Sequence, residues 1–443
     1  MGGVHTAAER SEMLGAIGAT SIEDLLLQVP AELRAGAYDW PAALTEPELM
    51  GHARGLAAKN RRPICFAGGG AQDHHVPAAV AALVRRGEYL SAYTPYQAEA
   101  SQGLLQAIYE FQSSVCALYG MDVANASLYD GSTALAEACG AAVKITGRRK
   151  VLVPDNLPPT WAETLRTYFR ARGEPEVETL ECPAGSIDPE LAGRQIDESI
   201  AALVVATPNA YGLLEDGERL AAAAHAHGAL AIAVADPVSL GILEAPGKWG
   251  ADIAVGEGQG LGMPLNYGGP YLGLFSCKKA FARHVPGRIC GQTRDAEGRR
   301  GFVLTLQARE QHIRRERASS NVCSNEALCA LAATIHMALL GPSGMEEVGA
   351  TCAEKAHRLA EKLCAVPGYR LRFSGPFFNE FALECPISAK RVRDRLMKAG
   401  ILAGVPLGEW SATLENVLLV CATERRTDAE IDLYAAALER LGR

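Results

Sequence analysis

The chain lacks an excess of positive charge, and its first residues lack an apolar run of signal-peptide length. Its 443 residues include 43 Lys and Arg against 51 Asp and Glu, which gives a formal net charge of −8. Because nucleic acids and anionic membranes call for a basic face, we expect neither as a partner. Residues 1–10 have no apolar core, and no window reads as a membrane span. These absences favour a soluble, cytoplasmic protein.

Cysteines at C-x-x-C spacing are also absent, although the chain has 12 cysteines. Several of them lie in apolar runs, namely Cys139, Cys329, Cys364 and Cys421. Free cysteine is one of the most buried residue types, so this placement favours reduced thiols in the core of a cytosolic protein. Zinc ligands or disulfides are the alternative interpretation. We expect no bound metal.

Apolar strand patterns and helical patterns alternate through the middle of the chain. Short apolar runs predict buried strands at residues 150–154, 200–205, 229–234, 251–255 and 271–275. Apolar residues at helical spacing predict helices at residues 104–118 and 216–227. Strands that are apolar on both faces and separated by helices indicate an α/β fold with a mostly parallel sheet. Ligands of such sheets bind beyond the carboxyl ends of the strands.

The pattern divides the chain into three expected domains. Residues 1–65 predict an N-terminal helical arm, in which Ser21 begins a capped helix. An arm of this kind can wrap around another subunit. Residues 66–335 predict the large α/β domain. Residues 336–443 predict a small C-terminal α+β domain, because helix and strand patterns there are short and mixed.

A candidate phosphate site opens one of the predicted helices. Asp130 and Gly131 are followed by two hydroxyl residues, Ser132 and Thr133. The free N–H groups at a helix start and the helix dipole suit a phosphate. The same residues would serve equally well as an ordinary N-cap. Both interpretations stay open at this point.

Asp236 is a second candidate, because it follows an apolar strand directly. Enzymes of the aspartate-aminotransferase-like class place a carboxylate there to pair with the pyridinium nitrogen of pyridoxal phosphate (PLP). An ordinary capping aspartate before Pro237 is the alternative. Residues 207–212 fall where that class has a strand-end loop over the cofactor ring.

The segment that should carry the Schiff-base lysine of a PLP enzyme contains no lysine. Residues 256–264 read GEGQGLGMP. Lys248 precedes the neighbouring strand and would lie at its wrong end, while Lys278 and Lys279 read as surface charge. A PLP enzyme holds its cofactor through a lysine, so this chain has the sequence pattern of such an enzyme without the lysine itself. The combination predicts half of an enzyme, with the lysine and the chemistry on a partner chain.

Two further segments are rich in groups that bind polar ligands. Residues 93–103 contain two phenols, an acid and two amides, which suit a small polar ligand, although the tyrosines of a structured loop could simply pack. Residues 309–317 contain four arginines. Such a run is usually a solvated helix face. Alternatively, its arginines and His312 hold a carboxylate or phosphate at an interface.

The adjacent His74 and His75 point apart on most backbones, which argues against a metal site that they share.

At these segments the chain resembles glycine decarboxylase, the PLP-dependent P-protein of the glycine cleavage system. Within that family it resembles the N-terminal half-protein, subunit 1 of the two-subunit form. The matching segments extend over most of the chain and lie at residues 93–103, 120–127, 267–273 and 309–321. The resemblance implies the aspartate-aminotransferase-like fold, PLP-dependent transferase fold type I, with a large domain and a smaller C-terminal domain.

In this family only the second half carries the PLP lysine. The family's spacing, counted back from Pro264, puts Gln259 at the lysine position. Gln259 cannot form an aldimine, so the resemblance implies that a partner, subunit 2, holds the PLP. The residues of this chain that would be remnants of a cofactor site are Ser132, Thr133, Asp236 and Gln259.

The resemblance also implies the reaction and its participants. Glycine is decarboxylated on PLP, and the aminomethyl group passes to the lipoyl arm of the H-protein, the lipoamide being the acceptor. Residues of this chain would reach the partner's active site across the interface, and they are expected to be Tyr93, Thr94, Tyr96, Gln97, Glu99 and Ser101. The second choices are His312, Arg314 and Arg315. The family expectation for the assembly is a heterotetramer of two plus two subunits.

Two other functions stay open from the sequence. The first is a self-sufficient PLP enzyme, such as an aminotransferase or a desulfurase, with a displaced lysine. That enzyme would be coloured when purified alone. The second is a non-catalytic scaffold that only keeps a partner soluble. For a scaffold, changes at Tyr93, Tyr96 or Glu99 would leave the activity of the assembled complex unchanged.

Overall fold

The computed structural model describes residues 4–36, 38–90, 93–170, 173, 175–318 and 320–441. The chain forms two compact units, Met1–Arg62 and Pro63–Arg443. The three-domain division drawn from the sequence stays a prediction. Each unit is described by itself below.

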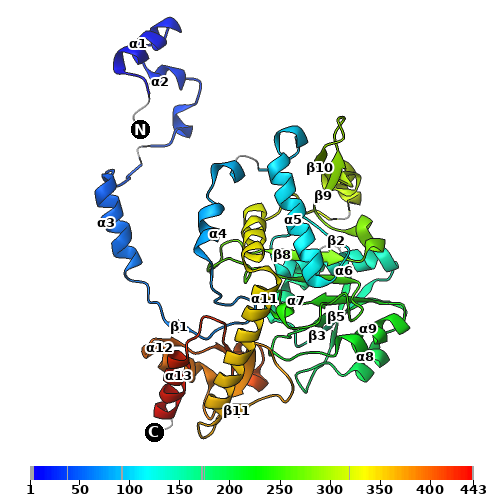
Figure 1. The fold of residues 1–443 in the computed structure, drawn as a ribbon. Coiled ribbons are helices and arrows are strands. Elements are labelled where there is room, and N and C mark those ends of the chain that lie inside the picture. The colour runs from blue at the N-terminus through cyan, green and yellow to red at the C-terminus, as the bar shows by residue number, and fades with distance from the viewer. Residues whose placement is uncertain are drawn as a thin grey trace. The chain divides into compact units, whose positions relative to one another are not determined.

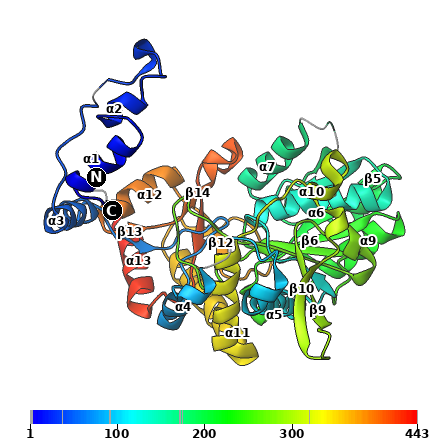
Figure 2. The same ribbon diagram turned by 90° about the horizontal axis from the view of Figure 1, so that it is seen from above.

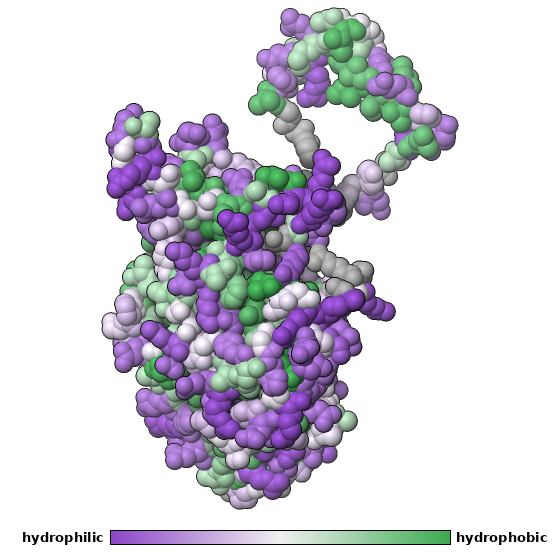
Figure 3. Space-filling model, turned by 90° about the vertical axis from the view of Figure 1, so that its right-hand side faces the viewer, coloured by the Kyte–Doolittle hydropathy of each residue, from purple (hydrophilic) through white to green (hydrophobic). Residues whose placement is uncertain are grey.

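The first unit consists of helices α1 (Ala7–Ala16), α2 (Ile22–Leu25) and α3 (Glu46–Ala57) (Figure 1). Each helix begins with a capping box, which satisfies free N–H groups at its start. Ser21 caps α2, as the sequence predicts. None of the three helices has a buried residue, and Trp40 is 77% exposed. Apolar residues therefore gather on the surface of this unit (Figure 3).

A seven-stranded sheet organises the second unit, in the order β2-β8-β7-β6-β5-β3-β4. Its strands are β2 (Val123–Ala124), β3 (Lys150–Pro154), β4 (Glu176–Leu180), β5 (Ile200–Ala206), β6 (Leu230–Val234), β7 (Ile253–Glu257) and β8 (Gly273–Cys277). Strands β3 to β7 are parallel, while β8 and β2 pair antiparallel at one edge. The expected α/β fold with a mostly parallel sheet is confirmed.

Helices cover both faces of this sheet, which explains why its strands are apolar on both sides. On one face lie α6 (Gly131–Thr146) and α7 (Pro159–Arg170). On the other face lie α5 (Gln102–Tyr119), α8 (Pro189–Gln195), α9 (Gly217–Ala226) and the first part of α11 (Ala327–Cys364). Two cores result, one on each side. We call this part the large lobe.

The small lobe is a four-stranded antiparallel sheet, in the order β11-β12-β15-β14, with helices α12 and α13 (Figure 2). Its elements are β11 (Arg370–Leu371), β12 (Glu380–Glu384), α12 (Ala389–Lys398), β14 (Val405–Pro406), β15 (Val417–Cys421) and α13 (Asp428–Leu441). The short strands β1 (Ile64–Cys65) and β13 (Ile401–Leu402) pair in parallel beside it. The remaining elements are α4 (Ala78–Leu83), the hairpin β9 (Ile289–Arg294) and β10 (Arg300–Thr305), and α10 (Gln311–Arg314).

Helix α11 joins the two lobes. The backbone at Gly341 leaves the helical region, with φ 62° and ψ −176°, and Pro342 follows. The part before this break packs on the large sheet, and the part after it packs in the core of the small lobe. By length and composition α11 is apolar enough to cross a membrane, so the expectation that no window has this character is wrong. A helix of this length and composition is also typical of the core of a soluble protein.

The first prediction concerns Gly256, where β7 passes close to α5. A Cβ atom at this position would lie 2.2 Å from Tyr119 Oη and 2.3 Å from the carbonyl oxygen of Ala235. Tyr119 Oη donates a buried hydrogen bond to that carbonyl, at 2.8 Å. Gly256→Ala should therefore lower the free energy of unfolding by about 1–3 kcal/mol, measured by urea denaturation.

Gly103→Ala is the matched control, since Gly103 lies in α5 and a Cβ atom added there would meet no heavy atom within 4 Å. Alanine favours the helix, so this variant should be neutral or more stable by up to about 1 kcal/mol. Equal stability of Gly256→Ala and the wild-type chain would contradict the packing described for β7.

Candidate functional site

A cavity opens at the carboxyl ends of strands β5, β6 and β7, where α/β sheets bind ligands. The strands contribute Ala206, Val234 and Glu257 to its wall. The small lobe contributes Asn379 and Glu380. The remaining wall is made by residues of α7 and of the loops after β1, β3, β5, β6 and β7, among them Gly69, Gln72, His74, Pro158, Trp161, Pro208, Asn209, Asp236 and Gln259. The predicted strand-end loop at residues 207–212 thus borders the cavity.

The family spacing puts Gln259 at the Schiff-base position. The residue is 2% exposed, and both the oxygen and the nitrogen of its side-chain amide are hydrogen-bonded. Its Oε1 accepts a hydrogen bond from the backbone N–H of Gln72, at 2.9 Å. Its Nε2 donates to the carbonyl of Met263, at 2.8 Å. Among the described residues that line the cavity there is no lysine. Lys278 pairs with Asp252 (2.7 Å), beside the start of β7 and thus at the opposite end of that strand.

The start of α6, the candidate phosphate site, is occupied by the chain's own carboxyl groups. Asp130 Oδ1 accepts bonds from the Thr133 N–H and the Ser132 hydroxyl, both at 2.8 Å. The N–H of Gly131 donates to Glu257 Oε2, at 2.9 Å. A Cβ atom on Gly131 would lie 2.4 Å from the Trp161 ring, so that ring closes over the turn. The N-cap interpretation is therefore the one that the structure supports.

Glu257 accepts two further hydrogen bonds, from the N–H groups of Gln259 and Leu272, both at 3.0 Å. Burial raises its pKa to about 8, against the three N–H bonds, which lower it. Its two oxygens thus accept hydrogen bonds from backbone N–H groups at the start of α6, just after β7 and just before β8. A phosphate group at this place would have to displace Glu257.

Asp236 is the one part of the predicted cofactor site that keeps a free acceptor. Its Oδ1 accepts from the N–H of Val238, at 2.9 Å. Its Oδ2 is buried and has no hydrogen-bond partner among the described residues. A pyridinium N–H would suit that oxygen. Because Gln259 cannot form an imine and the start of α6 is occupied, the residues of this cavity do not fit PLP held as a Schiff base.

The six residues expected to reach a partner lie on the surface, away from this cavity, at the turn before α5. Tyr93 is 86% exposed, and its hydroxyl is 2.5 Å from the Ser324 hydroxyl. Tyr96 is 58% exposed. Glu99 and Gln97 are exposed as well, whereas Thr94 and Ser101 are partly buried. Of the two interpretations of the tyrosines, the structure favours presented rings over packed ones.

Arg288 was not among the site residues predicted from the sequence, but its buried side chain contacts Tyr96 directly. It is 6% exposed, and its Nη2 donates to Tyr96 Oη at 2.9 Å. Its guanidinium carbon lies 5.3 Å from the centre of the Tyr96 ring, a cation–π distance. The ring of His312 lies 6.3 Å from that of Tyr96 on another side. A lone arginine inside a basic segment carries no sequence signal for such a contact.

The arginine-rich segment differs from the expected solvated helix face. Only Gln311–Arg314 is α-helical, because the chain turns at Arg315, which has φ 54°. His312 Nδ1 lies 3.8 Å from Glu310, and Arg314 Nε donates to the carbonyl of Ala308. Arg309 is partly buried, and burial lowers its pKa. The segment is therefore a folded loop against the Tyr96 region, not one continuous helix.

The chain is similar along its whole length to one protein family. The family model described as glycine cleavage system P-protein matches residues 4–438. A protein of Chlorobium limicola named probable glycine dehydrogenase (decarboxylating) subunit 1 is 51% identical, over 99% of both chains. A protein of Moorella thermoacetica with the same name is 49% identical, over 98% of both chains.

Solved structures agree with the sequence relatives. A crystal structure of glycine decarboxylase (P-protein) of the glycine cleavage system, in inhibitor-bound form, has a TM-score of 0.92 and 45% identity, with both chains covered completely. Glutamate decarboxylase of Lactobacillus brevis has a TM-score of 0.69 at 13% identity, covering 92% of this chain and 95% of its own, which shows the fold alone. The chain thus has PLP-dependent transferase fold type I, as the sequence predicts.

The pH dependence of stability tests the electrostatics of the cavity. Burial and the charge of Asp236 raise the pKa of Glu380 to about 7, although the Gly69 N–H donates to its Oε1 at 2.7 Å. The folded chain then holds a proton that the unfolded chain has lost, so stability falls as pH rises from 4.5 to about 7.

Glu380→Gln stays neutral and lacks this decrease. Relative to the wild-type chain, its free energy of unfolding should rise between pH 5 and pH 8 by up to about 3 kcal/mol, from urea denaturation at both pH values. Glu384→Gln is the control, because Glu384 lies in the same strand as Glu380 and forms a partly exposed ion pair with Arg370. The difference in free energy of unfolding between this variant and the wild-type chain should not rise with pH. A constant difference between Glu380→Gln and wild type would mean that Glu380 is ionised throughout this range.

Proposed function

The chain belongs to the glycine cleavage system P-protein family, as a subunit 1 of glycine dehydrogenase (decarboxylating), and we propose that it is the half without the Schiff-base lysine. In this proposal subunit 2 holds the PLP, and this chain completes the partner's active site. The observation that carries the proposal is Gln259, whose side chain is locked between Gln72 and Met263 at the place where a PLP enzyme needs a lysine.

The occupied start of α6 supports the same proposal. A cofactor phosphate needs free N–H donors, and the Gly131 N–H is already bound to Glu257. Ser132 and Thr133 serve the N-cap instead. The cofactor-site residues Ser132, Thr133, Asp236 and Gln259 are then remnants, and they keep the fold of the strand ends without holding the cofactor.

The surface around Tyr96 is what this chain would bring to the reaction. PLP on the partner supplies the electron sink for loss of CO2 from glycine. Because Tyr96 Oη accepts from Arg288, its own proton is left to donate to an incoming acceptor, such as the glycine carboxylate. Tyr93, Thr94, Gln97, Glu99 and Ser101 would surround that acceptor or line the entrance for the lipoyl arm. His312 closes one side of the Tyr96 ring.

The remaining participants follow from the same family membership. The aminomethyl group would pass to the lipoamide of the H-protein, whose disulfide is reduced. The assembly would be a heterotetramer of two plus two subunits, located in the cytoplasm. The many exposed apolar side chains of Met1–Arg62 suit burial against another subunit, although a scaffold subunit would share that property.

The first experiment is to purify the full chain alone and with subunit 2, and to record visible absorbance and glycine-dependent CO2 exchange. We expect a colourless, inactive chain alone and an active, PLP-coloured pair. A coloured and active single chain would instead indicate the self-sufficient PLP enzyme.

Tyr96→Phe separates a contribution to catalysis from scaffolding. Loss of the hydroxyl removes a donor aimed at the reacting region, so the exchange rate of the assembled pair should fall by about 10²–10³-fold. Tyr109→Phe is the matched control, because Tyr109 packs its ring on Phe302 within the chain, and it should leave the rate unchanged. Full activity of Tyr96→Phe in a normally assembled pair would favour the scaffold.

A further inference from the structure

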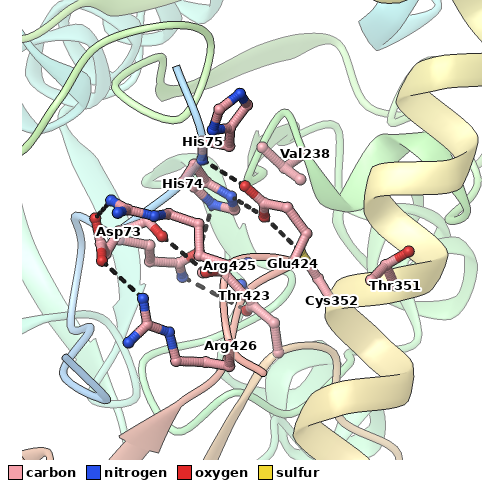
Figure 4. Close-up of polar contacts among 12 residues, drawn as sticks. Asp73, His74, His75, Val238, Thr351, Cys352, Thr423, Glu424, Arg425 and Arg426 are labelled. Carbon is pink, nitrogen blue, oxygen red and sulfur yellow. Dashed lines mark hydrogen bonds and ion pairs between the residues drawn. The ribbon is translucent and has the colours of Figure 1, made fainter. Parts of the chain in front are cut away.

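Three side chains of types that ligate metals converge at the edge of the cavity, where His74 also lines its wall (Figure 4). His74 comes from the loop after β1, Cys352 from the second part of α11, and Glu424 from the turn after β15. His74 and Cys352 are 5% and 0% exposed. Their ligand atoms and a Glu424 oxygen all lie within 4.8 Å of one another.

We propose that His74, Cys352 and Glu424 form a binding site for one divalent transition-metal ion of the zinc class. Imidazole, thiolate and carboxylate together are the ligand set that zinc prefers. His74 Nδ1 is 2.8 Å from Glu424 Oε2, and Cys352 Sγ is 3.2 Å from the same oxygen. Tetrahedral zinc with bonds of about 2.0–2.3 Å separates its ligands by about 3.3–3.6 Å. The two separations that involve Glu424 would need to widen by a few tenths of an ångström, and His74 Nδ1 and Cys352 Sγ already lie within 4.8 Å of each other.

Outer contacts already orient two of the three ligands. The second nitrogen of His74, Nε2, faces Gln72 Oε1 at 3.2 Å. Asn379 Nδ2 also donates to Gln72 Oε1, which shows that this atom is an acceptor. Nε2 of His74 therefore carries the hydrogen in its bond to Gln72. Nδ1 is thereby the nitrogen left for a metal, which is how ligating histidines are usually held. The other oxygen of Glu424 is bonded to the backbone N–H of His75.

The charge of the site would not change on metal binding. Without metal, His74 faces acceptors with both nitrogens and is an imidazolium, Cys352 donates its S–H, and Glu424 is a carboxylate. One M²⁺ ion would replace the Nδ1 proton and the thiol proton. The N–H and S–H bonds break, the M–N, M–S and M–O bonds form, and two protons leave to solvent. No oxidation or reduction takes place.

The carboxyl group of Asp236 has one oxygen, Oδ2, that is buried without a hydrogen-bond partner among the described residues. Asp236 and His74 both line the cavity described above, which gives an ion a path from solvent. The fourth coordination position, facing that path, would be left for water. The ring of His75 points away from Glu424 in Figure 4, so the His75 side chain is not a ligand of the site.

The test uses the full chain, stripped of metal with a chelator and titrated with Co²⁺ in place of the spectroscopically silent Zn²⁺. Co²⁺ bound by a cysteine thiolate gives charge-transfer absorption in the near ultraviolet. We expect this band to saturate at one Co²⁺ per chain, with release of two protons, and to be displaced by Zn²⁺. The background variant Cys323→Ser removes the exposed thiol, which could otherwise bind cobalt.

Variants of the ligands decide the assignment. Cys352→Ser should abolish the band, and Glu424→Gln should weaken Co²⁺ binding at least as much as loss of an outer-shell partner, about 10–100-fold. His74→Ala should weaken it similarly, whereas the matched neighbour His75→Ala should bind as the wild-type chain does. Absence of saturable binding, or a band that survives Cys352→Ser, would overturn the site.

A second measurement covers the case in which a variant folds poorly. An ion that binds only the folded chain raises the midpoint of thermal unfolding with ion concentration. Zn²⁺ should therefore raise the midpoint of the wild-type chain, and Mg²⁺ at the same concentration should not, since Mg²⁺ prefers oxygen ligands. An equal response to both ions would contradict the proposal without any variant.

Discussion

The carboxyl group of Glu257 is the interaction on which the centre of this molecule depends. Its three N–H donors belong to the start of α6, to the turn after β7 and to the approach to β8. Gly256 beside it leaves room for the Tyr119–Ala235 hydrogen bond. A carboxyl group buried in this way costs stability unless it is hydrogen-bonded, and the three backbone N–H groups around Glu257 supply these bonds. The same arrangement occupies the Gly131 N–H, one of the donors that a cofactor phosphate would need at the start of α6.

Two surfaces of the chain consequently have different properties. The cavity at the strand ends keeps the shape of a cofactor site, but its polar groups mostly bond to one another. In the Tyr93–Tyr96 region, by contrast, polar groups are exposed to solvent. Their positions are fixed by hydrogen bonds from Arg288 to Tyr96 and between Ser324 and Tyr93. Binding and catalytic groups commonly stand on loops that a rigid scaffold positions. A subunit that serves a partner's chemistry is expected to have this distribution.

Much of the fold was predictable, because the signals involved are local. The run at residues 150–154 is β3, and the run at residues 200–205 lies within β5. Strong apolar runs between turn residues leave few alternatives. The β9–β10 hairpin was not predicted, since only part of Ile289–Arg294 is buried and its outer half reads as polar loop. The helix expected from the arginine run ends at Arg314, because the backbone of Arg315, with φ 54°, leaves the helical region.

The candidate site was predictable in place but not in detail. Strand ends pointed to Asp236 and Gln259, and the family spacing pointed to the missing lysine. Nothing local could show that Glu257 binds the Gly131 N–H, or that Arg288 lies beneath Tyr96 at a sequence separation of 192 residues. His74 is likewise separated from Cys352 and Glu424 by hundreds of residues, so only the folded chain brings the three together.

The break in α11 has a mechanical consequence. A continuous helix would transmit any tilt of one lobe directly to the other, whereas Gly341 lets the two halves of α11 change their angle by rotation about a few backbone bonds. Both lobes contribute to the wall of the cavity, the large lobe through Ala206 and Glu257 and the small lobe through Asn379 and Glu380. A change in the angle between the lobes would therefore change the width of the cavity.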